Sequence, residues 1–291
     1  APAGAFTMTD AQSARPDRGA SSGARVTPEG VHSHDDSPAR NYTSSELLAV
    51  MASRTLEDGQ TVFAGVGIPL LAATLAQRLH APGITLLFEG GVLGPFIVPG
   101  ELPPSTNEQR CTRRANMILP ITDVLLLLQR GYVDIGFLGG AQIDHYGNIN
   151  TSFIGDPAKP KTRLPGTGGG NDIASLAKIV VAMKHEKRRF VEKVDFITSP
   201  GFLSGGDSRR KAGLTTGGMH KIVTDLAILG VDPASKRLRV EALHPGVGAD
   251  QVRANTGFEI EFAPNAAVTG SPTGPELAVL RQLDPARLYT A

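Results

Sequence analysis

The sequence predicts an α/β fold in which an open, mainly parallel sheet carries flanking helices. The first observation is one stretch in which short apolar segments alternate with a helical pattern. An apolar strand at 61–64 breaks at Gly65 and Gly67, a helix is expected at 68–81, and a second apolar strand follows at 84–88. This order of strand, glycine turn, helix and strand is typical of a βαβ unit, whose strands are parallel neighbours.

The second observation is that the same order returns further along the chain. Residues 123–140 predict a helix and then a strand that ends at Gly139 and Gly140. Residues 172–184 predict another helix that runs directly into a strand, and we expect one more strand at 194–200. The repetition predicts a sheet of several parallel strands.

Other elements begin and end this pattern. A helix is predicted at 44–56, with Ser44 or Ser45 as its N-cap. Residues 221–243 predict antiparallel strands around an Asp-Pro turn, and 274–284 predict a last helix.

The composition excludes several classes of protein. The 291 residues include 29 basic and 28 acidic side chains, which nearly cancel, so a polycationic surface for nucleic acid is not expected. A single cysteine excludes an intrachain disulfide and fits a reducing compartment. No apolar stretch reaches the roughly 18 residues of a membrane span. We therefore expect a cytoplasmic protein with neither a nucleic-acid nor a membrane partner.

Residues 1–41 differ from the rest of the chain. They are rich in Ala, Gly, Ser, Pro and charged residues, without an apolar period. Such a segment cannot bury enough apolar surface to offset its ordering entropy. We predict a disordered N-terminal extension followed by one domain over 42–291. His32 and His34 form a weak ligand pair without a second cluster, so no metal site is predicted.

One carboxylate stands in an unusual position. Glu89 follows the predicted strand at 84–88 and precedes Gly90 and Gly91, in "LLFEGGVLGP". A glutamate at the end of a buried strand, on a turn almost without side chains, either caps the turn or is presented to a group that approaches closely.

The glycine turns differ from known phosphate-binding motifs. "GVGIPL" lacks the third glycine of the dinucleotide-binding fingerprint, and "PGTGGGND" lacks the Lys-Ser/Thr pair of a P-loop. Each turn alone is consistent with an ordinary turn. Ligands of open α/β sheets bind outside the carboxyl ends of the strands, however, and three glycine turns follow strands here.

Four longer segments resemble a known family. "GGAQIDHYGNIN", "DPAKPKTRLPGTGGGNDIA", "HEKRRFVEKVDFITSPGF" and "NTGFEIE" together resemble the β subunit of class I CoA-transferases, in particular of the glutaconate CoA-transferase type. The resemblance covers residues 42–291. It implies a CoA-transferase-like (NagB/RpiA-like) domain that pairs with a separately encoded α subunit, with the active site at their interface.

The resemblance also implies roles for individual residues. The "FEGG" turn matches the family's nucleophile, so Glu89 is expected to attack an acyl-CoA and to carry CoA as a γ-glutamyl thioester. The substrates would be an acyl-CoA and a carboxylic acid, with a dicarboxylic acid implied by the glutaconate type. Coenzyme A would be a substrate, and no permanently bound cofactor is expected. The residues assigned to oxyanion stabilisation and CoA contacts are Gly139, Gly140, Ala141, Gln142, Gly65, Gly67, Gly168 and Gly169.

Several alternatives stay open. The basic residues Lys184, Lys187, Arg188 and Arg189 either meet the CoA phosphates or form a solvated face, and we favour the solvated face. Cys111 is expected to be structural, and the turn signal of Gly147-Asn148 accounts for the segment around His145 without an acid–base role. A thioester hydrolase, a decarboxylase on the same scaffold and a non-catalytic interaction subunit are the alternative functions. Glu89 argues against the first two.

Overall fold

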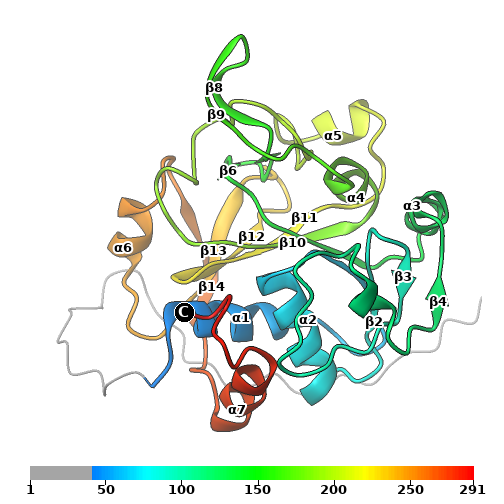
Figure 1. Cartoon of the computed structure of the whole chain (residues 1–291). Coiled ribbons are helices and arrows are strands. Elements are labelled where there is room, and N and C mark those ends of the chain that lie inside the picture. Colours follow the sequence, from blue (N-terminus) through cyan, green and yellow to red (C-terminus); the bar gives the residue numbers. More distant parts are fainter. Residues whose placement is uncertain (1–40) are drawn as a thin grey trace, which may run out of the picture.

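A computed structural model describes residues 41–291. A ten-stranded sheet runs through the molecule, with helices on both of its faces (Figure 1). The helices are α1 (Ser44–Ser53), α2 (Ile68–Leu79), η1 (Gln109–Thr112), α3 (Ile121–Gln129), α4 (Gly170–Leu176), α5 (Ser208–Lys211), α6 (Ala249–Ala254) and α7 (Gly274–Leu283).

The strands fall into the large sheet and two small hairpins. The strands are β1 (Thr61–Ala64), β2 (Thr85–Leu87), β3 (Val92–Leu93), β4 (Met117–Ile118), β5 (Ile135–Leu138), β6 (Gln142–Ile143), β7 (Ile149–Asn150), β8 (Phe153–Asp156), β9 (Lys159–Arg163), β10 (Lys178–Ala182), β11 (Gly218–Val223), β12 (Ala227–Val231), β13 (Leu238–Leu243) and β14 (Glu261–Val268).

The order of the strands confirms the predicted fold class. The large sheet reads β14-β13-β12-β11-β10-β5-β1-β2-β3-β4. Its five central strands, from β11 to β2, are all parallel, and β12, β3 and β4 join through antiparallel pairs. The predicted βαβ unit is present, with Thr61 of β1 opposite Thr85 of β2 and α2 as the crossover.

The central strands are buried on both faces, and their side chains alternate between two cores. In β1, Val62 and Ala64 belong to the core under α1, α2 and α7, whereas Phe63 belongs to the core under α3 and α4. In β2, Leu86 and Leu87 divide in the same way. This alternation is the period-two geometry of a strand that helices cover on both sides.

One face is covered by α1, α2 and α7, which lie together below the sheet in Figure 1. All residues of α1 after the first are buried, which explains why its sequence is apolar on nearly every side. Its N-cap is Thr43, so the prediction of Ser44 or Ser45 is wrong. Thr43 takes this position because it forms a capping box with Glu46, in which each side chain satisfies the other residue's backbone N–H.

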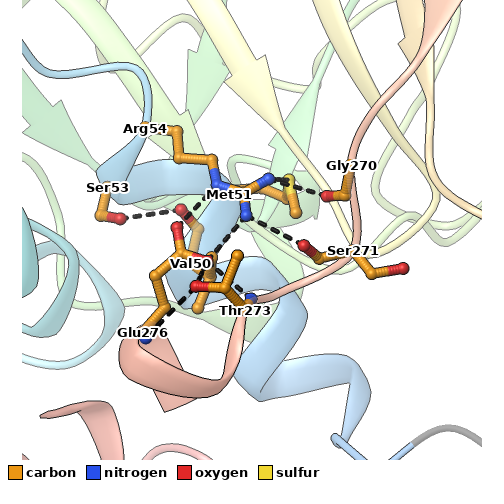
Figure 2. A network of polar contacts seen from close by, with 8 residues as sticks. All are labelled: Val50, Met51, Ser53, Arg54, Gly270, Ser271, Thr273 and Glu276. Carbon is orange, nitrogen blue, oxygen red and sulfur yellow. Dashed lines mark hydrogen bonds and ion pairs between the residues drawn. The ribbon is translucent and has the colours of Figure 1, made fainter. Parts of the chain in front are cut away.

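Two ion pairs tie α1 to α7. The Arg54 guanidinium contacts the Glu276 carboxylate at 2.7 and 2.8 Å and also donates to the carbonyls of Gly270 and Ser271 (Figure 2). Arg281 of α7 contacts the buried Glu46 carboxylate at 2.7 Å. These contacts fix the helix of residues 274–283, whose predicted position is confirmed, over the helix that begins the fold.

The opposite face carries α3, α4 and the small hairpins, of which β8–β9 projects away from the body of the molecule (Figure 1). The prediction of a strand at 194–200 is wrong. This segment forms bends, and only Ser199 makes an isolated bridge, to Ile149 of β7. Because the side chains of Asp195 and Thr198 bind neighbouring backbone N–H groups, they take the place of a regular ladder.

Residues 1–40, with the predicted disordered extension and the His32–His34 pair, lie outside the described residues. Within 41–291, no helix has both the length and the apolar character needed to cross a bilayer. No group of three or more His, Cys, Asp or Glu in this range is placed to hold a metal ion.

Candidate active site

Glu89 lies in a tight turn that joins β2 to β3. The Gly91 N–H donates to the Phe88 carbonyl at 3.0 Å, which closes the turn, and the Phe88 N–H donates to the Val92 carbonyl at 2.9 Å. Phe88 is fully buried, whereas Glu89 is partly exposed. The turn therefore anchors the chain through Phe88 and holds the glutamate at the carboxyl end of the parallel sheet, as the sequence predicts.

The two glycines after Glu89 are required by close neighbours. Gly91 has a φ of +99°, and the Leu119 carbonyl occupies the place that a side chain would need. A methyl group added at Gly90 would likewise collide with the Thr106 carbonyl and with Asn107 Oδ1. A side chain at either position would push these segments away, so the glycine pair serves close backbone packing.

A second glycine segment faces the carboxylate from across the site. A methyl group added at Gly168 would lie 3.5 Å from Glu89 Oε2, and one added at Gly169 would lie 3.6 Å from Oε1. Among residues 41–291, no hydrogen bond or ion pair to the Glu89 carboxylate is formed. The carboxylate is therefore close to backbone on one side and is not engaged in holding the fold together.

A cavity of about 230 Å³ opens beside Glu89. Its lining is mainly apolar or glycine, and Glu89 is the one charged side chain in it. The lining residues are Phe63, Ala64, Gly65, Val66, Pro69, Glu89, Thr106, Phe137, Leu138, Gly139, Thr167, Gly169, Gly170 and Ile173. The ends of β1, β2 and β5 thus meet the start of α4 around one small, weakly polar space.

The structure brings part of the predicted site together. Gly65, Gly139 and Gly169 line the cavity with Glu89, and Gly168 lies next to the carboxylate. At Gly65 and Gly139 an added methyl group would meet no atom within 4 Å, so both glycines face open space. These two positions leave the backbone accessible without being needed for packing.

The other predicted residues do not line the cavity. Gly67 is the N-cap of α2 and faces Tyr289. Gly140 packs against Ile149, where an added methyl group would come within 2.8 Å, and neighbouring Ala141 leads into β6. These three positions therefore serve turns and close packing around the site.

Gln142 in particular has a structural environment. Its side chain is buried, and its Nε2 donates to Asp195 Oδ2 at 3.1 Å. Its Oε1 accepts from Asn150 Nδ2 at 2.7 Å and from the Asp195 N–H at 3.2 Å. An amide with all of these partners joins β6 to neighbouring segments and is not directed at the cavity.

The four basic residues between positions 184 and 189 differ in their exposure to solvent. Lys184, Lys187 and Arg188 are exposed. Arg189 is partly buried, contacts Glu186 at 3.0 Å and donates to the Gly140 carbonyl at 3.2 Å. Arg189 thus supports the turn that follows β5, a contact that the spacing of basic residues in the sequence does not indicate.

Cys111 and His145 both lie outside the cavity lining. Cys111 is fully buried, and burial raises the pKa of its thiol, as expected for a structural cysteine. His145 lies in the turn that the Gly147 N–H closes on the Asp144 carbonyl at 2.9 Å, and its ring packs against Tyr146 and Phe258.

Sequence reasoning missed two hydroxyl groups of the cavity. Thr167 stands inside the "PGTGGGND" motif, and its side chain could have been identified as the polar member of that loop. Thr106 comes from an irregular segment that packs on Gly90, and no local pattern marks it. The resulting site offers a free carboxylate, two hydroxyls and unshielded backbone, which suits covalent chemistry at an acyl group.

Known proteins share this sequence and fold. Residues 45–255 match the family model described as Coenzyme A transferase. The chain is 42% identical over 245 residues to the β subunit of the 3-oxoadipate CoA-transferase of Pseudomonas knackmussii, covering 84% of this chain and 94% of the relative. It is 36% identical over 256 residues to the β subunit of the glutaconate CoA-transferase of Acidaminococcus fermentans, covering 86% and 95%.

The structural comparison agrees with the sequence comparison. The crystal structure of glutaconate coenzyme A-transferase from Acidaminococcus fermentans superposes with a TM-score of 0.82 at 35% identity, covering 86% of this chain and 98% of that chain. This chain therefore belongs to the coenzyme A transferase family, as a class I β subunit.

Proposed function

We propose that this subunit moves coenzyme A from an acyl-CoA to a carboxylic acid through a γ-glutamyl-CoA thioester on Glu89. The observation that carries the proposal is the Glu89 carboxylate itself. It stands at the carboxyl ends of parallel strands, beside a largely apolar cavity, without a hydrogen bond or ion pair within residues 41–291. A carboxylate in such surroundings is available as a nucleophile.

The proposed reaction consists of two nucleophilic attacks on carbonyl carbons, followed by the reverse of both. A Glu89 oxygen attacks the thioester carbonyl, and the C–S bond breaks to give an acyl-glutamyl anhydride and the CoA thiolate. The thiolate then attacks the Glu89 carbonyl, which releases the first acid as its carboxylate and leaves the glutamyl-CoA thioester. The acceptor carboxylate reverses both steps, so the enzyme returns to its starting form and no proton or oxidant is consumed.

The backbone around the cavity supports the charged intermediates. Each attack passes through a tetrahedral oxyanion, and a well-placed donor stabilises such an oxyanion by about 3–4 kcal/mol. Gly65 and Gly139 expose their backbone to the cavity, so we assign the oxyanion contacts to these two turns. Gly168 and Gly169 leave room beside Glu89 for the CoA thiol arm. The apolar lining limits the access of water, which would otherwise hydrolyse both intermediates.

The names of the relatives support a class of substrate and a partner for this subunit. The two relatives above are named for 3-oxoadipate and glutaconate, which are both dicarboxylic acids, and each is named as one subunit of its enzyme. We therefore propose a dicarboxylic acid as substrate and a separate α subunit as partner. Because the cavity lining contains no cationic side chain, the second carboxylate would be bound outside this cavity.

Mass spectrometry of the complex tests the role of Glu89. The two subunits, incubated with acyl-CoA and no acceptor, should gain the mass of CoA on the peptide that contains "FEGG". Glu89→Ala should remain folded and lose both the label and CoA transfer. Near wild-type transfer by this variant, or a label on Cys111, would refute the proposal.

The conservative variant separates transfer from hydrolysis. Glu89→Asp withdraws the carboxylate by about 1.5 Å, and a misplacement of about 1 Å can cost roughly 100-fold in an oriented reaction. The shortened side chain also leaves room for a water molecule, which it can activate as a general base. We expect Glu89→Asp to lose transfer and to gain acyl-CoA hydrolysis, measured as free CoA released without an acceptor.

A further inference from the structure

The segment that faces Glu89 is a loop between β9 and α4, residues 164–169. Its glycines lie against the Glu89 carboxylate, and Gly168 has a φ of +48°. A loop of this composition has little intrinsic rigidity, because glycine has the largest conformational freedom in the unfolded chain. The position of its backbone near the carboxylate must therefore be set by contacts at its two ends.

The first end is held by the segment between β7 and β8. The Gly166 N–H donates to the Thr151 carbonyl at 2.8 Å, and the Leu164 N–H donates to the Ser152 carbonyl at 3.0 Å. The position of residues 164–166 therefore depends on where the backbone of residues 151–152 lies.

The second end is held at the start of α4. Thr167 Oγ1 accepts from the Asn171 N–H at 2.8 Å, and the Thr167 carbonyl accepts from the Gly170 N–H at 2.8 Å. The Asn171 side chain in turn donates through Nδ2 to the Thr198 carbonyl at 3.1 Å. The start of the helix is thus tied to a segment far along the chain.

Thr198 contacts the residues that hold both ends of the loop. Its Oγ1 accepts from the Thr151 N–H at 3.0 Å and lies 2.7 Å from Ser152 Oγ, while its carbonyl accepts from Asn171. Thr198 is only 4% exposed, and its own N–H donates to the Ile149 carbonyl at 2.9 Å. One buried residue therefore contacts both segments that anchor the glycine loop.

We infer that Thr198 is a positioning residue, which together with Asn171 holds Gly168 and Gly169 at a fixed distance from the Glu89 carboxylate. The inference rests on the proposed role of Glu89 as the nucleophile. Loss of either contact releases one end of the loop, which lets the glycine backbone drift and admits water to the glutamyl-CoA thioester. The expected consequence is slower transfer and a larger share of hydrolysis.

Three variants of the intact complex test this inference. Thr198→Val keeps the shape of the side chain but removes the hydroxyl that binds residues 151 and 152. Asn171→Ala removes the other contact from an exposed side chain, so folding should be unaffected. Each should lower kcat for transfer about 10-fold, with KM for acyl-CoA changed less than about 2-fold, because geometry at the reacting atoms is lost while binding is kept. Thr198→Ser, which keeps the hydroxyl, should have a kcat close to that of the wild type.

A matched control separates positioning from stability. Thr256 is also buried, at 4% exposure, and its hydroxyl binds His185 Nε2 at 3.0 Å and the Val252 carbonyl at 2.8 Å. It does not line the Glu89 cavity. Thr256→Val should lower the melting temperature by a similar amount to Thr198→Val without changing kcat or the ratio of hydrolysis to transfer.

The outcomes distinguish this inference from the proposed function. If Glu89→Ala abolishes transfer while Asn171→Ala and Thr198→Val both keep wild-type kcat and hydrolysis ratio, the positioning role is refuted and the nucleophile stands. If Glu89→Ala transfers CoA normally, the proposed function is refuted, and the inference that rests on it is refuted as well. Should Thr198→Val not fold, Asn171→Ala decides alone.

Discussion

Glu89 owes its position to two residues without side chains. Gly90 and Gly91 let the segments of residues 106–107 and Leu119 pack directly on the turn, so the turn is held from outside as well as by β2 and β3. The sequence predicts the turn because two glycines follow an apolar strand. It does not predict the packing, because the segments that press on the turn come from residues without any regular pattern.

A pair of glycine substitutions in and after β5 tests which glycines serve the site. An added methyl group at Gly139 meets no atom within 4 Å, so we expect Gly139→Val to fold normally and to raise KM for acyl-CoA by filling the cavity. At Gly136 an added methyl group would collide with Ile173 of α4, so Gly136→Ala should lose about 1–3 kcal/mol of stability through overpacking. Melting temperatures and steady-state kinetics of both variants check this contrast. Unchanged kinetics in Gly139→Val would show that substrate does not enter this cavity.

The assigned glycines also show where residue-level prediction stops. Gly65 and Gly139 agree with the rule that ligands bind at the carboxyl ends of parallel strands, whereas Gly169 is assigned from its glycine-rich loop. Gln142 is assigned by resemblance together with Gly139, but the structure directs its side chain elsewhere. The partner of that side chain, Asp195, lies 53 residues further along the chain, so local sequence gives no sign that the amide is already engaged.

At the scale of elements, long apolar periods are predicted well and short or irregular segments are not. The helices α1, α2, α3, α4 and α7 and the central strands lie where the hydrophobic pattern places them. The strands β3, β4, β6 and β7 have two residues each, too few for any period to show. Residues 194–200 resemble a strand in sequence because they contain the apolar residues Val194, Phe196 and Ile197 within a short segment that ends at Pro200. Instead of a regular ladder, the side chains of this segment bind the backbone of other segments: Asp195 accepts from the Gly155 N–H and Thr198 from the Thr151 N–H.

The contact between α1 and α7 should make stability depend on acid pH. Burial of Glu276 favours its neutral form, but hydrogen bonds from Arg54 and Thr273 outweigh this effect and lower the pKa of Glu276 to about 2. A carboxylate whose pKa falls on folding contributes stability above its unfolded pKa near 4.5, and this contribution is lost as the pH falls toward 2. We expect the free energy of unfolding to decrease over this window.

Glu276→Gln should be less stable than the wild type at neutral pH, and its stability should fall less steeply between pH 4.5 and 2. Chemical denaturation at a series of pH values measures both effects. Glu259→Gln is the matched control, because Glu259 is exposed and forms no ion pair within residues 41–291. Equal slopes for Glu276→Gln and the wild type would contradict the assignment.

At the scale of the whole molecule, the site collects residues from widely separated parts of the chain. The turns after β1, β2 and β5 meet the loop before α4. The Thr198 carbonyl accepts a hydrogen bond from Asn171, at the start of α4 where that loop ends. The parallel sheet is predicted from the alternation of apolar strands with helices, and the family from motifs that are long and ordered. The register that brings these parts together depends on tertiary pairing, which no single segment specifies.

The proposed partner gives a prediction at this scale. The cavity of this chain supplies a nucleophile but no cationic side chain for an acid substrate, so the purified chain alone should not transfer CoA. Addition of the α subunit should produce transfer with a stoichiometry near one to one. The measurement is exchange of CoA between two acids by each chain and by the mixture. Full turnover by this chain alone would overturn the two-chain proposal.

The long sequence separation between α1 and α7 affects how the protein folds during synthesis. Its cover, α7, contacts it through Arg281 and Glu46, which are 235 residues apart. At about 5–20 residues per second of translation, α1 leaves the ribosome roughly 10–50 s before α7 does. During that interval the apolar surface of α1 lacks its contact with α7, so we expect the nascent chain to bind ribosome-associated chaperones. Protease digestion of stalled nascent chains should show α1 becoming protected only after residues 274–283 have emerged.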